Sequence, residues 1–151
     1  WRESDATALR SIVPGSSLKT GSVSKENDAM QRFVWNETDF IEYLSVIPNV
    51  EECGVAHHFV VHRNGLRLLL SVYQLDAEVW ISLYREESNQ SLFTVSLKDS
   101  PGARLVRNRN GEDYIEFAAG DVFGGRYDGE SMIPMGIRLS VDPDFNIQLF
   151  Q

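Results

Sequence analysis

The chain has 151 residues, of which 42% are hydrophobic, and this is enough to form one domain with a buried core. Its formal net charge of −8 disfavours nucleic acids and anionic membranes as partners, because their phosphates attract basic surfaces. No apolar run approaches the roughly 20 residues that a membrane-spanning helix needs. A protein partner, and in particular a basic one, suits this charge.

The single cysteine, Cys53, has no second cysteine to pair with, which favours a reducing compartment. The first ten residues, WRESDATALR, also lack the apolar segment of a signal peptide. We therefore expect a cytoplasmic protein. Glu51 and Glu52 beside the cysteine disfavour its thiolate, so we expect Cys53 to be a small buried or half-buried residue and not a nucleophile.

The N-terminal part differs in composition from the rest. Residues 14–28 are rich in Ser, Gly and Lys and hold few large apolar groups, which is typical of a loop or linker. We predict an N-terminal arm over residues 1–28 and a single α+β domain over residues 29–151.

Residues 36–47, NETDFIEYLSVI, are predicted to form a helix. Asn36 is a suitable N-cap, and Pro48 ends the helix. The expected buried stripe consists of the apolar residues at helical spacing: Phe40, Tyr43, Leu44 and Ile47, with Ile41 beside them. One stripe of this kind usually packs on a sheet, although a helix that binds a partner is an alternative.

From Val55 onward the hydrophobic period changes to two, which indicates strands. The predicted strands are 55–63, 66–74, 78–85, 91–98, 103–108, 112–118, 135–141 and 144–150. Short turns separate them, so most neighbours should be antiparallel. The predicted fold is α+β and mostly β, with an N-terminal helix packed on an antiparallel meander of about eight strands that forms a curved sheet or a partly closed barrel.

The stretch HHFVVHRNGLRLLL, residues 57–70, contains all three histidines. A two-residue turn at Asn64-Gly65 would place Arg63 opposite Leu66 and His57 opposite Val72. The side with Phe59, Val61, Leu68 and Leu70 should face the core. His57 lies on that side, whereas His58 and His62 lie on the other.

This geometry argues against a metal site, and we expect no cofactor. His58 and His62 lie roughly 13 Å apart along an extended strand, too far to share one ion. Arg67, opposite His62, would also repel a cation.

The same alternation predicts a patch of aromatic and basic side chains on the wetter side of the sheet: His58, His62, Arg67, Tyr73, Trp80 and Tyr84. Tyr, Trp and Arg are enriched in binding hot spots. The alternative is that the helix or the N-terminal arm covers this side.

A second candidate is the glycine-rich segment 120–136, in which Arg126 and Asp128 are predicted to contact a partner or ligand. A plain connection between strands is an alternative. The spacing of a phosphate-binding loop or of an EF-hand is absent.

These features favour a non-catalytic binding protein that engages a protein partner in an inhibitor, immunity-type or adaptor role. One alternative is a β-cup or barrel for a small ligand, with a pocket lined by Trp80, Tyr84 and Phe117. Another is a small hydrolase, with His58 or His62 as the base and a carboxylate to orient it. The chain has no G-x-S-x-G motif, which leaves the enzyme hypothesis without a sequence signature. The oligomeric state is left open.

Overall fold

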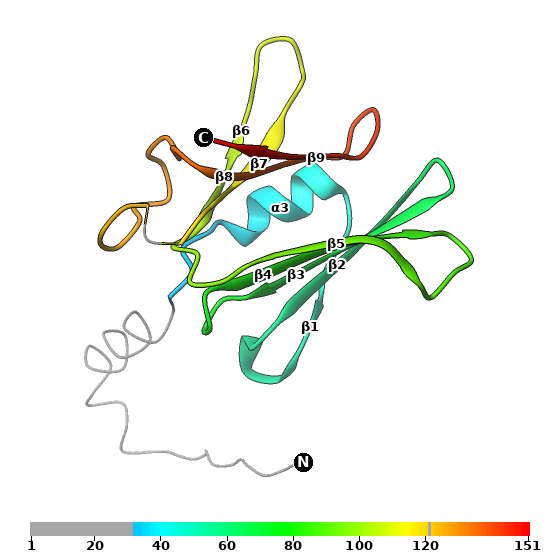
Figure 1. Ribbon diagram of the computed structural model, residues 1–151, viewed down its shortest axis with the longest axis horizontal. Helices are drawn as coiled ribbons and strands as arrows, with labels where there is room; N and C mark the ends of the chain where they lie inside the picture. Colours follow the sequence, from blue (N-terminus) through cyan, green and yellow to red (C-terminus); the bar gives the residue numbers. More distant parts are fainter. Residues whose placement is uncertain (1–31, 121) are drawn as a thin grey trace. The chain divides into compact units, whose positions relative to one another are not determined.

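The computed structural model describes residues 32–120 and 122–151 (Figure 1), so the predicted arm 1–28 lies outside the described residues. The elements are α3 (Glu37–Leu44), β1 (Asn49–Val50), the 3-10 turn η2 (Glu52–Gly54), β2 (His57–Arg63), β3 (Leu66–Tyr73), β4 (Glu78–Arg85), β5 (Ser91–Leu97), β6 (Ala103–Val106), β7 (Tyr114–Ala118), β8 (Gly136–Ser140) and β9 (Asn146–Phe150). No helix within the described ranges is long and apolar enough to cross a membrane.

The mostly-β prediction is confirmed, but the strands form two antiparallel sheets where one meander was expected. The first sheet has the order β1-β2-β3-β4-β5 and the second the order β6-β7-β8-β9. Each of the eight predicted strands is present with ends within a few residues of the prediction, and β1 is an additional short strand. Over residues 32–120 and 122–151, the sheets do not close into a barrel.

The break between the sheets lies at residues 98–102. Here the chain pairs with Val34 instead of continuing the first sheet: the Val34 N–H donates to Pro101 O, and the Ala103 N–H donates to Val34 O. The approach is so close that a Cβ on Gly102 would lie 2.2 Å from Val34 O. Glycine is therefore needed at this position for the segment before α3 to reach the start of the second sheet.

Helix α3 is shorter than predicted. Asn36 caps it as expected by accepting from the Asp39 N–H, but the helix ends at Leu44 because Ser45 adopts a left-handed conformation with φ 59°. Ile47 consequently lies outside the helix and is 85% exposed, so the prediction that it belongs to the buried stripe is wrong.

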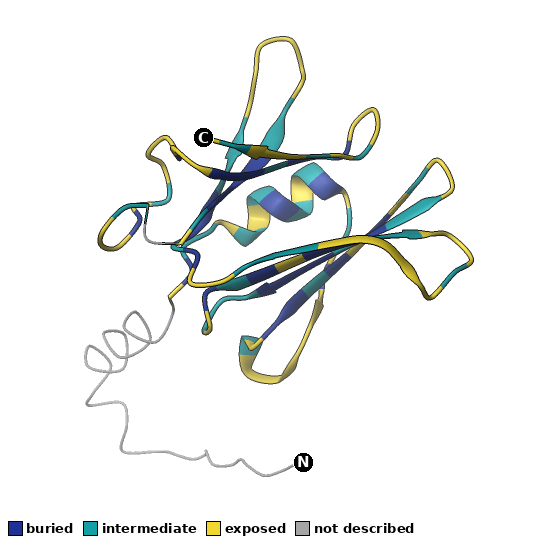
Figure 2. Ribbon diagram, in the orientation of Figure 1, coloured by how far each residue is buried: buried dark blue, intermediate teal, exposed yellow. Residues whose placement is uncertain are grey.

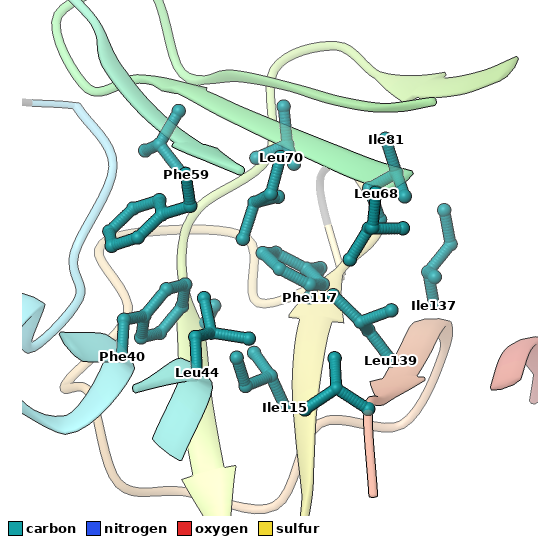
Figure 3. Packing of buried hydrophobic residues seen from close by; sticks show 14 of the residues in the cluster. Phe40, Leu44, Phe59, Leu68, Leu70, Ile81, Ile115, Phe117, Ile137 and Leu139 are labelled. Carbon is teal, nitrogen blue, oxygen red and sulfur yellow. The ribbon is translucent and has the colours of Figure 1, made fainter. Parts of the chain in front are cut away.

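The main core lies between the two sheets, around α3 (Figures 2 and 3). The Phe40 ring lies 6.0 Å from the Phe59 ring of the first sheet and 5.9 Å from the Phe117 ring of the second. Leu44 is also buried, one turn further along the helix. One face of a single short helix therefore contacts both sheets.

The predicted register of the β2–β3 hairpin is confirmed at both ends, with Arg63 opposite Leu66 and His57 opposite Val72. Asn64 and Gly65 both have positive φ, as the predicted turn requires. The four expected core residues, Phe59, Val61, Leu68 and Leu70, are buried. His57 shares their side, where its ring stands edge-on to Trp35 and its Nε2 lies 3.4 Å from Glu37 Oε2.

Cys53 is exposed, so the expectation of a buried or half-buried residue is wrong. It belongs to η2, between β1 and β2, and has φ 61°. The tight turn at this position directs the thiol to the surface and away from the core.

Candidate partner-binding face

The six residues of the predicted patch share the face of the first sheet that lies away from α3. They are His58 and His62 in β2, Arg67 and Tyr73 in β3, and Trp80 and Tyr84 in β4. Two rows run across the strands: one pairs His58 with Ser71 and Ser71 with Trp80, and the other pairs His62 with Arg67 and Arg67 with Tyr84. We call this surface the outer face. The alternative in which the helix covers it is wrong, because α3 packs on the opposite side, whereas the alternative in which the N-terminal arm covers it concerns residues outside the described ranges.

The first row is organised around His58. Its Nε2 lies 2.5 Å from Glu51 Oε2, and its Nδ1 lies 2.7 Å from Ser71 Oγ. Glu51 reaches the histidine from the turn after β1. The two contacts hold the imidazole in one orientation between a carboxylate and a hydroxyl group.

Two aromatic side chains lie beside this histidine. The Tyr73 ring stands edge-on to the His58 ring with the centroids 6.0 Å apart. Burial raises the pKa of the Tyr73 phenol, and the charges of Glu51 and Glu78 raise it further. Trp80 donates its indole N–H to Glu78 Oε1 at 2.7 Å and is still 38% exposed. An indole that is fixed at its polar atom but open on its ring is suited to bury apolar surface on binding.

The second row is organised around Glu86, at the start of the turn after β4. His62 Nδ1 lies 2.6 Å from Glu86 Oε1. Arg67 donates to the backbone carbonyl of Glu86 at 3.2 Å and to that of Ser88 at 3.1 Å, and its guanidinium lies 4.6 Å from the centroid of the Tyr84 ring. The arginine therefore fixes the turn and stacks on a neighbouring aromatic ring.

Between the two rows, the side chains of the outer face are small and carry no charge. Val60 is 39% exposed there, and Ser82 Oγ lies 3.1 Å from Thr94 Oγ1 of the edge strand. The carboxylates of Glu51, Glu78 and Glu86 stand at the borders of the face. Arg67 is the arginine that the rows set against these three carboxylates, and acidic borders of this kind suit a basic surface.

The two remaining predicted residues, Arg126 and Asp128, do not join the outer face. They belong to the segment after β7, in which Tyr127 and Ile133 pack with Ala118 of the second sheet. The Phe123 ring stacks on the Tyr127 ring with the centroids 4.6 Å apart. Burial raises the pKa of Tyr127 to about 12. Residues 122–135 thus cap the second sheet, and Arg126 is exposed on this cap.

Asp128 has a role within this cap. Its Oδ1 accepts from the N–H groups of Glu130 and Ser131 at 2.8 and 2.7 Å, and its Oδ2 accepts from the Ser131 hydroxyl at 2.6 Å. These hydrogen bonds, the one from the Ser131 hydroxyl most of all, lower the pKa of Asp128 to about 2. Its carboxylate is therefore engaged within the turn, whether or not a partner also contacts it.

We expect Ser131→Ala to raise the pKa of Asp128 towards its ordinary value, because the substitution removes the strongest of these hydrogen bonds. Since the folded-state pKa is depressed, the stabilisation of the turn is complete above the ordinary pKa of about 3.9 and is lost as the pH falls towards about 2. An NMR titration of the Asp128 carboxyl carbon in both variants measures this shift. An unchanged midpoint in Ser131→Ala would contradict the assigned cause.

Sequence reasoning missed a buried carboxylate in the second sheet. Glu116 is 1% exposed, and its two oxygens accept from Arg104 Nε and Arg138 Nε, both at 3.0 Å. The alternation of residues along the strands could have revealed this ion-pair cluster. It places Glu116 on the same face as Arg104 and Arg138, which lie opposite it on the neighbouring strands.

The pocket of the ligand-cup alternative does not form. Phe117 is fully buried in the core, whereas Trp80 and Tyr84 lie on the outer face of the other sheet. A hollow of about 520 Å³ lies instead against β8 and β9, and most of the residues around it are polar or charged, among them Asp113, Asp142 and Arg138. Small-ligand pockets are usually lined by apolar groups, so this hollow gives the alternative little support.

A metal centre finds no support in the described part of the chain, where no three His, Cys, Asp or Glu side chains gather as ligands would. Both ring nitrogens of His58 instead contact a hydroxyl group or a carboxylate, and Nδ1 of His62 contacts a carboxylate.

Comparison with known proteins gives one informative result. No family model and no curated protein matches the sequence. Among solved structures, the fold is similar to a chain of a "Contact-dependent growth inhibition toxin - immunity protein complex from Klebsiella pneumoniae 342". The TM-score is 0.61 with 14% sequence identity, and the match covers 80% of this chain and 97% of that chain. At this identity the similarity establishes a shared fold.

Proposed function

We propose that this chain is a non-catalytic binding protein that holds a basic protein partner on its outer face, in an inhibitory role of the immunity type. The observation that carries the proposal is the gathering of His58, His62, Arg67, Tyr73, Trp80 and Tyr84 on one face that α3 leaves uncovered. Aromatic and arginine side chains on a rigid sheet are typical of binding hot spots.

Two further observations support the details. The acidic borders of the outer face and the net charge of −8 favour a basic partner, because opposite charges speed the encounter. The similar solved chain comes from a toxin–immunity complex, which supports an immunity-type role over a general adaptor role. A reducing, cytoplasmic setting and a domain over residues 29–151 are part of the same proposal.

Differential capture tests the proposal. The full chain, Trp80→Ala and Leu149→Ala are immobilised side by side and exposed to lysate of the source organism. Leu149 is 77% exposed on the second sheet, so its substitution is a matched control for the loss of an exposed apolar side chain. We expect one basic protein to be retained by the unmodified chain and by Leu149→Ala but lost from Trp80→Ala. Equal retention by all three variants, or by none, would contradict the proposal.

One observation favours a second candidate, a serine hydrolase. Glu51, His58 and Ser71 form a hydrogen-bonded series with the connectivity of a catalytic triad. The position of Ser71 in the sheet argues against a hydrolase. Ser71 is 5% exposed and lies in β3, which is paired with strands on both sides, so nearby backbone N–H groups serve the sheet and not an oxyanion hole.

We therefore expect no labelling of Ser71 by a fluorophosphonate probe, which phosphonylates activated serines in hydrolases with loss of fluoride. Labelling is measured by intact mass on the full chain, with Ser71→Ala as the control. An adduct that disappears in Ser71→Ala would overturn the non-catalytic proposal in favour of the hydrolase.

A further inference from the structure

The first sheet ends at strand β5, which exposes two large apolar side chains. β5 is the last strand of the order β1-β2-β3-β4-β5, and no described strand pairs with its other side. Leu92 is 53% exposed and Phe93 is 46% exposed, although both are large apolar residues. Edge strands present a row of backbone N–H and C=O groups that are free to pair.

The β5 edge carries an irregularity at one end only: a β-bulge against β4 leaves Leu92 between the pairs Tyr84–Ser91 and Leu83–Phe93. Its seven residues, SLFTVSL, contain no charge and no proline, and the regular pairing with β4 extends from Phe93 to Leu97. Natural proteins commonly place lysine, proline or a very short strand at such a position. An open edge of this length points to a partner strand.

The sequence of β5 is complementary to itself in the antiparallel direction. If two copies meet with Thr94 opposite Thr94, then Phe93 of each copy faces Val95 of the other. Both residues lie on the core side of the sheet, because their β4 neighbours are Leu83 and Ile81. Apolar side chains would thus continue the core across the new boundary, while Thr94 stays on the outer face.

The ends of the strand are complementary in charge as well. In this register, Lys98 of one copy lies opposite Gln90 of the other, next to the turn that carries Glu86 and Glu87. A register shifted by two residues, centred on Val95, also keeps apolar side chains together, but it places Lys98 opposite Leu92 and therefore farther from this turn.

We infer that β5 pairs with β5 of a second copy of this chain, about a two-fold axis at Thr94, to form a continuous ten-stranded sheet from two five-stranded ones. The outer face of each copy stays open in this dimer, so the inference goes beyond the proposed function and does not depend on it. A contact through one strand edge is small beside the about 1,200–2,000 Å² of stable interfaces, so we expect an association that depends on concentration.

The edge of the second sheet is a poorer candidate. β9 has five residues, and Leu149 is 77% exposed on it. The charged residues that precede it are Asp142 and Asp144, and the neighbouring cation, Arg138, is already paired with Glu116. This edge supplies the control for the experiment.

The experiment substitutes the residue that faces its own copy. Thr94 is exposed, and its side chain contacts Ser82 Oγ, so lysine or glutamate can be placed there without disturbing the core. Sedimentation equilibrium of the full chain over a concentration series should show a dimer. Thr94→Lys and Thr94→Glu should each weaken dimerisation at least about tenfold, because like charges are brought together at the axis.

An equimolar mixture of Thr94→Lys and Thr94→Glu should restore the dimer, which a simple folding defect would not do. Leu149→Lys should leave dimerisation unchanged. Thr94→Cys in a Cys53→Ser background should form a disulfide-linked dimer on oxidation, because residues directly opposite in antiparallel strands have Cβ atoms about 4.5–5.5 Å apart. A monomer at all concentrations, or a dimer lost in Leu149→Lys but kept in Thr94→Lys, would overturn the inference.

Discussion

Replacing Phe40 by alanine is expected to lower the free energy of unfolding by about 3–5 kcal/mol, the usual cost of deleting a fully buried phenylalanine. The residue is completely buried, and its ring contacts Phe59 in the first sheet and Phe117 in the second. It also meets the Trp35 ring edge-on with the centroids 4.8 Å apart. Since a domain is typically stable by about 5–15 kcal/mol, this loss is a large part of the total.

Chemical denaturation of the full chain, followed by tryptophan fluorescence, measures this effect. Ile47→Ala is the control, because Ile47 is 85% exposed just beyond the same helix and should change stability by at most about 0.5 kcal/mol. A cost below about 1 kcal/mol for Phe40→Ala would mean that α3 does not join the two sheets as described.

Replacing Trp80 by alanine is expected to weaken binding of the captured partner at least about 30-fold, which corresponds to about 2 kcal/mol, the threshold for a hot-spot residue. Trp80 is the largest exposed apolar side chain of the outer face, and its indole N–H is held by Glu78. Its ring is thus positioned before the partner arrives, which reduces the entropy lost on binding.

Titration calorimetry with the isolated partner gives the two dissociation constants. Leu149→Ala should bind as the unmodified chain does, because this residue lies on the other sheet. Unfolding curves of both variants check that Trp80→Ala is folded. Equal affinities for Trp80→Ala and the unmodified chain would remove Trp80 from the binding surface.

The strands and the hairpin register were predictable because their signals are local. The alternation of apolar and polar residues sets which side of a strand faces the core, and Asn64-Gly65 sets the register of β2 against β3. The same alternation predicted that His62, Arg67 and Tyr84 share one face, and the structure shows them in one row. Residues of one face can thus be found from sequence once the turns are known.

The division into two sheets was not predictable because its cause is distant in sequence. The segment DSPG before β6 has the composition of an ordinary turn, and only the pairing of Val34 with Pro101 and Ala103 redirects the chain. Likewise, the early end of α3 depends on a serine, Ser45, in a left-handed conformation, which serine seldom adopts.

The carboxylates of the outer face were missed for a similar reason. Glu51 and Glu86 belong to turns, where charged residues are usually solvated, and only the folded chain brings them to His58 and His62. Their contacts turn two separate histidines into parts of one ordered surface with carboxylates at its borders. The sequence contained the residues, but their pairing follows from the tertiary structure.

Hydroxyl-radical footprinting of the complex tests most directly whether the partner occupies the outer face. The oxidation of Trp80, His58 and His62 is compared in the free chain and in the complex. Met132, which is 77% exposed in the segment after β7, serves as the internal reference. We expect the three outer-face residues to be protected in the complex while Met132 is oxidised as before. Protection of Met132 with unchanged oxidation of Trp80 would contradict the assignment of the outer face as the binding surface.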